Sequence, residues 1–216
     1  MTVTAKICGI NDPEAMRAAI AGGASHVGLV FYSPSPRSLN PGEAMALASV
    51  VPERVQKVGL FVDPEDDQID KTLHVVQLDM LQLHGDETPD RVRDLKARFG
   101  KKVMKVIKVS KPEDLVRAEA YVRIADALMF DAKPPKGMKD ALPGGNAVSF
   151  DWRILLECNW PLPWMLAGGL TKDNVAKAVE LSGARIVDTS SGVEDTPGRK
   201  NVEKIAEFLR TVSEID

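Results

Sequence analysis

Short apolar runs that are each followed by a proline-containing helix start recur along this 216-residue chain, and they constrain its fold more than any other feature. The first run, at 5–8, is followed by Asp12 and Pro13, which can cap a helix and occupy its first position. The run at 58–62 leads in the same way to Asp63 and Pro64. The same arrangement follows three further runs, at 27–31, 80–83 and 103–109. Each combination predicts a β-strand that leads into a capped α-helix.

Three more apolar runs raise the number of expected strands to eight, at 127–131, 164–167 and 185–188. The last expected helix places five apolar residues on one face, namely Val202, Ile205, Ala206, Leu209 and Val212. Eight strands that alternate with helices predict an α/β fold of the (β/α)8 type, the TIM barrel. A doubly wound open sheet stays an alternative because strand order cannot be read from one sequence. No expected strand, however, precedes the glycine fingerprint of a dinucleotide-binding fold.

A long loop at 132–149 interrupts the regular alternation after the sixth expected strand. It is polar and rich in proline and glycine, and loops of this length in compact domains are often functional. Because barrel enzymes place their sites at the carboxyl ends of the strands, we expect this loop to act as a lid. No linker divides the chain, so we expect residues 1–216 to form a single barrel domain.

The composition excludes several classes of partner. The formal net charge is −3 and no stripe of basic and aromatic residues is present, so we expect no nucleic acid. The sequence shows no signal peptide and no apolar run long enough to cross a bilayer, so we expect no membrane partner and a cytoplasmic protein. Cys8 and Cys158 have neither a disulfide framework nor a metal-binding spacing, and we expect no metal site.

The tetrapeptide Lys6-Ile7-Cys8-Gly9 combines a lysine and a cysteine at the end of the first expected strand. Side chains alternate between the faces of a strand, so Lys6 and Cys8 project to the same side. An ammonium group near a thiol favours the thiolate, which is the reactive form. Gly9 allows a sharp turn and keeps bulk away from the sulfur. The alternative is that Cys8 is a small buried apolar residue, as most free cysteines are.

Two glycine- or serine-rich stretches follow the seventh and eighth expected strands. Gly168 and Gly169 precede a helix, where exposed backbone N–H groups can bind an anion. The stretch after the eighth strand offers hydroxyl and amide groups from Ser190, Ser191 and Gly192. Barrels commonly bind phosphate at these two loops. Either stretch alone is an ordinary turn, and only the pair predicts a phosphate site.

Four polar residues are further candidates for the site, each with a structural alternative. Asp131 ends the sixth strand in an apolar context that favours a protonated carboxyl group, as a general acid requires, or it is a loop cap. Arg37 lies on a proline-stiffened loop, where a guanidinium suits a substrate carboxylate, or it is solvated. His84 either lines the barrel mouth or bonds the neighbouring loop. Asp188 either points into the mouth or supports it.

Six blocks of the sequence resemble, in the same order, the motifs of the phosphoribosylanthranilate isomerase family of tryptophan biosynthesis. The blocks are 6–9, 31–37, 82–87, 150–152, 166–170 and 188–194. The resemblance covers nearly the whole chain.

The resemblance implies an Amadori rearrangement without a cofactor, from N-(5-phosphoribosyl)anthranilate to 1-(2-carboxyphenylamino)-1-deoxyribulose 5-phosphate. It implies that Cys8 is the general base and Asp131 the general acid, and that Arg37 holds the anthranilate carboxylate. The substrate phosphate would be held by Gly168, Gly169, Ser190, Ser191 and Gly192. We expect further substrate contacts from His84 and Asp188. The expected partner is a small phosphorylated substrate, and the expected state is a monomer or homodimer.

Three positions depart from the pattern of that family. Asn146 and Ala147 follow Gly144 and Gly145, where threonine or serine followed by glycine is usual. An alanine adopts a positive φ less readily than a glycine, so the geometry of the loop, and with it the turnover rate, is put in question. Thr189 replaces a common valine, which we expect to be a minor change.

Two other functions remain open from the sequence. The first is a barrel enzyme for another sugar phosphate, of the ribulose-phosphate epimerase type, which typically uses metal-binding histidines or paired aspartates. The three histidines of this chain make such a site unfavourable. The second is a binding barrel that has lost its chemistry. The presence of both Cys8 and Asp131 argues against it, because binding alone needs neither.

Overall fold

The computed structural model of the chain describes residues 2–135, 137–138 and 141–215. Lys136, Lys139 and Asp140 of the predicted loop 132–149 lie outside the described residues, as do Met1 and Asp216.

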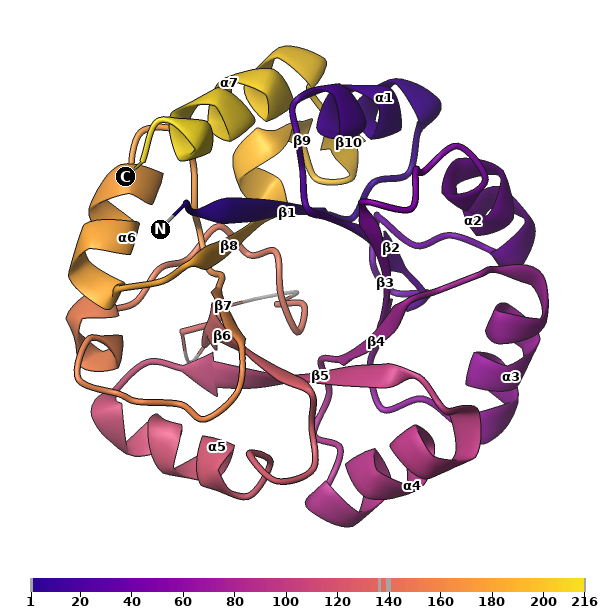
Figure 1. Cartoon of the computed structure of the whole chain (residues 1–216), viewed down its shortest axis with the longest axis horizontal. Helices are drawn as coiled ribbons and strands as arrows, with labels where there is room; N and C mark the ends of the chain where they lie inside the picture. The colour runs from indigo at the N-terminus through magenta and orange to yellow at the C-terminus, as the bar shows by residue number, and fades with distance from the viewer. Residues whose placement is uncertain (1, 136, 139–140, 216) are drawn as a thin grey trace.

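Eight parallel strands follow one another in chain order around a closed barrel, and helices surround them (Figure 1). The strands are β1 (Thr4–Cys8), β2 (His26–Val30), β3 (Gln56–Phe61), β4 (Met80–Leu83), β5 (Lys102–Val109), β6 (Ala127–Ala132), β7 (Trp164–Leu166) and β8 (Ile186–Thr189). The predicted TIM barrel is confirmed. The open-sheet alternative is wrong, because β8 pairs with β1 and closes the ring.

The helices cover the outside of the barrel. They are α1 (Pro13–Ala21), α2 (Pro41–Ala48), α3 (Asp66–Val75), α4 (Pro89–Phe99), α5 (Val116–Glu119), α6 (Val175–Ser182) and α7 (Val202–Ser213). Short 3-10 turns occur at η1 (Pro112–Leu115), η2 (Trp152–Leu155) and η3 (Ser191–Val193), and β9 (Glu194–Thr196) pairs with β10 (Arg199–Lys200) in a small hairpin. None of the described helices is both long and apolar enough to cross a membrane.

The predicted helix starts are correct where a side chain can cap the first turn of the helix. The Asp12 carboxylate accepts hydrogen bonds from the backbone N–H groups of Glu14 and Ala15, at 3.0 and 2.8 Å. The start predicted at Asp63–Pro64 is wrong, because α3 begins at Asp66 and its N-cap position is Glu65, whose side chain makes no capping hydrogen bond. Asp63 turns the chain with a φ of 44°, and its carboxylate accepts the N–H group of Asp86 in the next loop instead of capping the helix.

The buried face of α7 differs in part from the prediction. Ile205, Leu209 and Val212 are buried as expected, whereas Val202 and Ala206 are exposed. The buried stripe runs through positions 205, 208, 209 and 212, so that Phe208 takes the place expected for Ala206. Val202 lies on the first turn, where the helix leaves the β9–β10 hairpin.

The sixth crossover lacks the α-helix that the alternation predicts. Between β6 and β7 the described residues contain only the 3-10 turn η2, and the rest of the segment is loop. This segment begins at the carboxyl end of β6 and extends over the barrel mouth.

The barrel interior is filled in layers. Apolar side chains occupy its lower part, namely Val58, Met80, Met104, Val106, Ala127, Met129, Met165 and Ala167. A smaller cluster of Cys8, Val30 and Leu60 lies on β1, β2 and β3, and Leu60 is two residues beyond Val58 of the apolar layer, toward the carboxyl end of β3. Because side chains alternate along a strand, the inward positions beyond the apolar layer are those that reach the mouth.

Candidate active site

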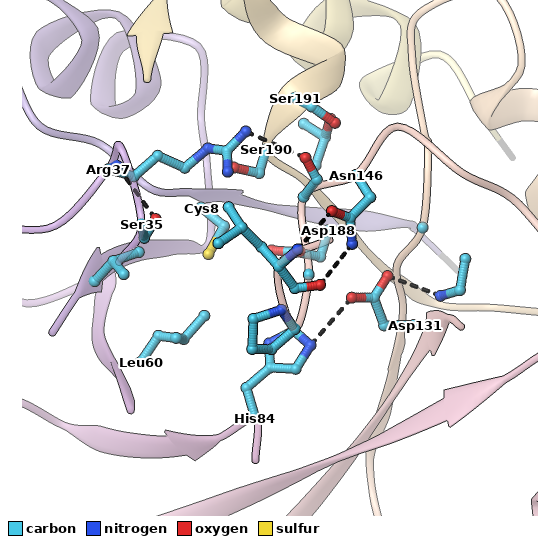
Figure 2. Close-up of a pocket in the computed structure, with 18 of the residues that line it drawn as sticks. Cys8, Ser35, Arg37, Leu60, His84, Asp131, Asn146, Asp188, Ser190 and Ser191 are labelled. Carbon is cyan, nitrogen blue, oxygen red and sulfur yellow. Dashed lines mark hydrogen bonds and ion pairs between the residues drawn. The ribbon is translucent and has the colours of Figure 1, made fainter. Parts of the chain in front are cut away.

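A cavity opens at the carboxyl ends of the strands (Figure 2). Nine of the ten predicted site residues line it, namely Cys8, Arg37, His84, Asp131, Gly168, Gly169, Asp188, Ser190 and Ser191. Strand alternation explains the placement, because Asp131 stands two positions beyond the interior residue Met129. The barrel therefore converts positions that are distant in sequence into one ring around the mouth.

Cys8 and Lys6 project into the barrel from β1, as the alternation predicts. Lys6 has no exposed surface, and its Nζ donates to Asp188 Oδ1 at 2.8 Å across the β1–β8 pairing. Gly28 on β2 leaves room for both side chains. A Cβ atom at Gly28 would lie 2.8 Å from Cys8 Sγ and 3.1 Å from Lys6 Nζ.

Burial and charge act in opposite directions on the Cys8 thiol. Burial raises the pKa of Cys8, and the neighbouring Lys6 ammonium lowers it only in part. The Asp188 carboxylate, which pairs with Lys6, also raises the pKa of Cys8. Lys6 therefore acts in the predicted direction, and burial opposes it.

Asp131 and His84 meet on the other side of the mouth. His84 Nε2 lies 3.2 Å from Asp131 Oδ2, without the alignment of a hydrogen bond. Asp131 Oδ1 accepts the N–H group of Ala132 at 2.8 Å. Gln82 Nε2 lies 3.4 Å from His84 Nδ1.

The two predicted phosphate-binding stretches adjoin each other at the mouth. Gly168 and Gly169 have φ values of 95° and 62°, which favour glycine at both positions. Within the described part of the chain, the backbone N–H groups of Gly168, Gly169, Ser190 and Ser191 donate no hydrogen bonds. Adjacent free N–H groups in such turns form an anion-binding concavity.

Arg37 extends from the loop after β2 along the wall of the cavity and is almost completely buried. Its Nε and Nη2 atoms each donate to the carboxylate of Glu194 at 2.8 Å. The guanidinium is therefore held in a fixed plane, unlike the solvated arginine of the alternative reading.

Comparison with known proteins agrees with this arrangement. Residues 5–211 match the family model of N-(5'-phosphoribosyl)anthranilate (PRA) isomerase. The chain is 57% identical over 210 residues to the N-(5'-phosphoribosyl)anthranilate isomerase of Paramagnetospirillum magneticum, with 97% of each chain covered. The solved phosphoribosylanthranilate isomerase of Thermotoga maritima superposes with a TM-score of 0.87 at 33% identity over 98% of each chain. Another, in complex with reduced 1-(o-carboxyphenylamino)-1-deoxyribulose 5-phosphate, gives 0.84 at 32% identity, again over 98% of each chain.

The chain belongs to the phosphoribosylanthranilate isomerase family.

Membership in this family confirms the resemblance of the six blocks and the prediction of an enzyme, an intramolecular isomerase. The roles of individual residues and the monomeric or dimeric state stay predictions. In the described residues, no three His, Cys, Asp or Glu side chains gather in a way that could hold a metal ion.

Gly192 is the one predicted site residue that does not line the cavity. A Cβ atom at Gly192 would overlap the carbonyl oxygen of Leu170 and would lie 2.8 Å from Thr189 Oγ1. Thr189 Oγ1 donates to that carbonyl at 2.7 Å. Gly192 therefore allows the loops after β7 and β8 to approach each other, and its contact with phosphate stays a prediction.

The loop after β6 covers the cavity with residues that include Leu142, Gly144, Gly145 and Asn146. The Asn146 side chain closes a turn, since Nδ2 donates to the Leu142 carbonyl at 2.7 Å and Oδ1 accepts the Leu142 N–H at 3.0 Å. Ala147 has a φ of 55°, a left-handed conformation that favours glycine. The concern about alanine at this position is therefore justified, and Asn146 takes part in holding the turn.

Three polar residues near the site were missed by the sequence analysis. Gln82 offered a signal, because a polar residue at an inward position of an apolar strand is unusual. Glu194 and Lys200 offered none, since the small hairpin that carries them leaves no periodic pattern.

We predict that Gly28→Ala displaces the Cys8 thiol, because the added methyl group cannot fit beside Sγ and Nζ. Overpacking of this kind costs about 1–3 kcal/mol, so the melting temperature should fall by several degrees. Gly42→Ala in the first turn of α2 is the control, because its nearest neighbour would be Asn40 Oδ1 at 3.3 Å. Equal stability of the two variants would contradict the close packing at Gly28.

We predict that the alkylation rate of Cys8 by iodoacetamide rises with pH and reaches its midpoint above the ~8.5 of an exposed cysteine. Burial raises the pKa of Cys8, so less thiolate is present at neutral pH in the folded protein than in the unfolded one. The measurement uses Cys158→Ala protein, with the same protein in denaturant as control. A midpoint in the folded protein below that in denaturant would refute the prediction.

We predict that Ala147→Gly leaves the melting temperature unchanged or raises it slightly. Relief of the left-handed conformation gains about 1–2 kcal/mol, and the greater entropy of a glycine in the unfolded chain costs about 0.4–1 kcal/mol. The control is Ala141→Gly, at a neighbouring position without a positive φ, which should only destabilise. A decrease for Ala147→Gly as large as that of the control would show that the strain is absent.

Proposed function

We propose that this chain converts N-(5-phosphoribosyl)anthranilate to 1-(2-carboxyphenylamino)-1-deoxyribulose 5-phosphate in tryptophan biosynthesis, with Cys8 as base and Asp131 as acid. The observation that carries the proposal is that Cys8 and Asp131 line one cavity together with the unpaired N–H groups of the loops after β7 and β8. The cavity thus combines an acid, a base and an anion-binding surface, as this rearrangement requires.

The first step opens the sugar ring. Asp131 donates a proton to the ring oxygen, the bond between this oxygen and C1′ breaks, and the anilino nitrogen supplies the electron pair of a cationic Schiff base. Asp131 lines the cavity and its Oδ2 lies opposite His84 Nε2, and this position supports the role of acid.

The second step moves hydrogen from C2′ to C1′. The Cys8 thiolate removes the C2′ proton, which the cationic imine has made acidic, and the electron pair forms the C1′–C2′ double bond of an enolamine. Protonation at C1′ and loss of the hydroxyl proton at C2′ then give the ketone, so atoms and electrons balance without an external oxidant. The Lys6 ammonium lies beside the sulfur and stabilises the thiolate when it forms.

The two anionic groups of the substrate would bind at separate parts of the cavity wall. We assign the phosphate to the N–H groups of Gly168, Gly169, Ser190 and Ser191, with Gly192 shaping the loop behind them. We assign the anthranilate carboxylate to Arg37, whose planar guanidinium suits it. The remaining contacts with the sugar fall to His84 and Asp188, which line the same cavity.

We predict that Cys8→Ala and Asp131→Asn each lower kcat by well over ~10²-fold, the usual contribution of a general base or acid. The fluorescence decrease of phosphoribosylanthranilate measures turnover, and circular dichroism checks the fold. Cys158→Ala serves as the control for loss of a thiol, since Cys158 does not line the cavity. Turnover near that of the wild type in either variant would remove the role assigned to that residue.

A further inference from the structure

Arg37, Glu194 and Lys200 form a buried charge cluster behind the wall of the cavity. Their side chains are 5%, 3% and 0% exposed. Lys200 Nζ donates to Glu194 Oε1 at 2.7 Å, the same oxygen that Arg37 Nε contacts. Two cations thus share one carboxylate, a formal excess of one positive charge that burial disfavours by lowering the pKa of Lys200. A buried charge without a partner is costly, so the cluster is suited to receive an anion.

The free edge of Arg37 identifies where this anion binds. Arg37 Nε and Nη2 both donate to the carboxylate of Glu194, and Nη2 also donates to the carbonyl of Gly145 at 3.3 Å. No described residue accepts a hydrogen bond from Nη1, and Arg37 lines the cavity. Gly145 permits this arrangement, since a Cβ atom there would lie 2.6 Å from Nη1. Nη1 is therefore the guanidinium nitrogen left free to donate to an anion in the cavity that Arg37 lines.

Lys200 connects the same carboxylate to the loop after β8. Its Nζ donates to the carbonyl and hydroxyl oxygens of Ser190 at 3.0 and 3.1 Å, in addition to Glu194. Gly9 lies where the two parts meet, because a Cβ atom there would be 2.6 Å from Arg37 Cδ and 3.1 Å from Ser190 Oγ. The guanidinium and the serine loop are thus parts of one rigid unit.

We propose that Glu194 and Lys200 are positioning residues for a substrate with two anionic ends, a carboxylate and a phosphate. Glu194 orients Arg37 so that Nη1 meets the carboxylate, and Lys200 ties this carboxylate site to the phosphate site at Ser190. The spacing of the two sites is then a property of the cluster, which selects anilino sugar phosphates that carry an ortho carboxylate. This inference rests on the proposed function for the identity of the substrate.

The test compares two stable ligands that differ only in the carboxylate. One is reduced 1-(o-carboxyphenylamino)-1-deoxyribulose 5-phosphate, and the other is its phenylamino counterpart. The ratio of their dissociation constants, measured by calorimetry, reports recognition of the carboxylate. In the wild type we expect a ratio of about 10–100, the usual range for a charge-assisted hydrogen bond. Arg37→Ala should reduce the ratio toward one.

Glu194→Gln should also reduce the ratio, by about tenfold, because Arg37 loses its bidentate partner. The double variant Arg37→Ala/Glu194→Gln should show no further loss, since Glu194 acts through Arg37. A ratio that stays at the wild-type value or rises in Glu194→Gln would overturn the proposal. It would mean that Glu194 only neutralises Arg37 and does not orient it.

Lys200→Met supplies a second test that does not depend on the folding of Glu194→Gln, since it leaves the Arg37–Glu194 pair balanced in charge. We expect both ligands to bind more weakly by a similar factor of about tenfold, because the serine loop loses its anchor. Lys200→Arg should restore part of the affinity. Unchanged affinity for both ligands in Lys200→Met would overturn the role of Lys200.

The matched control is Glu87→Gln, which breaks another buried ion pair at the barrel mouth. Glu87 and Lys105 are 2.6 Å apart, and neither lines the cavity. This variant should lose stability yet keep the wild-type ratio. Turnover of the wild type is measured separately. An unreactive wild type with an intact binding ratio would refute the proposed function alone, whereas an active wild type with an unchanged ratio in Glu194→Gln would refute only the inference.

Discussion

The buried ion pair between Lys6 and Asp188 is the interaction on which the site depends most. It joins β1 to β8, the pairing that closes the barrel, and it is 2.8 Å long with the lysine fully buried. Burial alone would lower the pKa of Lys6, and the Asp188 carboxylate holds that pKa above its usual range. Because the buried Lys6 charge must be paired, this contact favours one register of β1 against β8. Cys8 lies two residues beyond Lys6 on the same face of β1 and lines the cavity.

The same principle applies around the mouth, where apolar packing gives way to buried charges. Lys105 pairs with Glu87 beside β4 and β5, and Glu194 pairs with Arg37 on the loop after β2. Each pair connects a strand residue to a loop, so the loops are ordered by interactions that need exact geometry. The lower barrel contributes stability through the burial of apolar surface, an effect that does not depend on the orientation of the side chains. The mouth contributes the fixed orientations that binding two anions and moving two protons require.

The sequence was sufficient for features that depend on local spacing. Strand alternation predicted that Lys6 and Cys8 face the same way, and cap residues such as Asp12 marked helix starts. Features that depend on distant partners were not predictable. Lys6 and Asp188 are 182 residues apart, and Arg37 and Glu194 are 157 apart. The direction of the pKa shift of the Cys8 thiol depends on burial and on the distant Asp188 and Lys200, which no local pattern contains.

The backbone of the loop after β6, more than its side chains, encloses the reacting groups. A Cβ atom at Gly144 would lie 2.5 Å from His84 Cε1 and 2.8 Å from Asp131 Oδ2. Gly145 lies equally close to the guanidinium of Arg37. Glycine at both positions therefore lets the chain approach the acid and the arginine together. Both side chains are almost completely buried, so their electrostatic effect on a bound substrate is strengthened because the local dielectric is low. Asn146 closes the turn through its two hydrogen bonds to Leu142, and Ala147 adopts a left-handed conformation beside it, so the loop conformation and the chemistry of the cavity are coupled through the backbone itself.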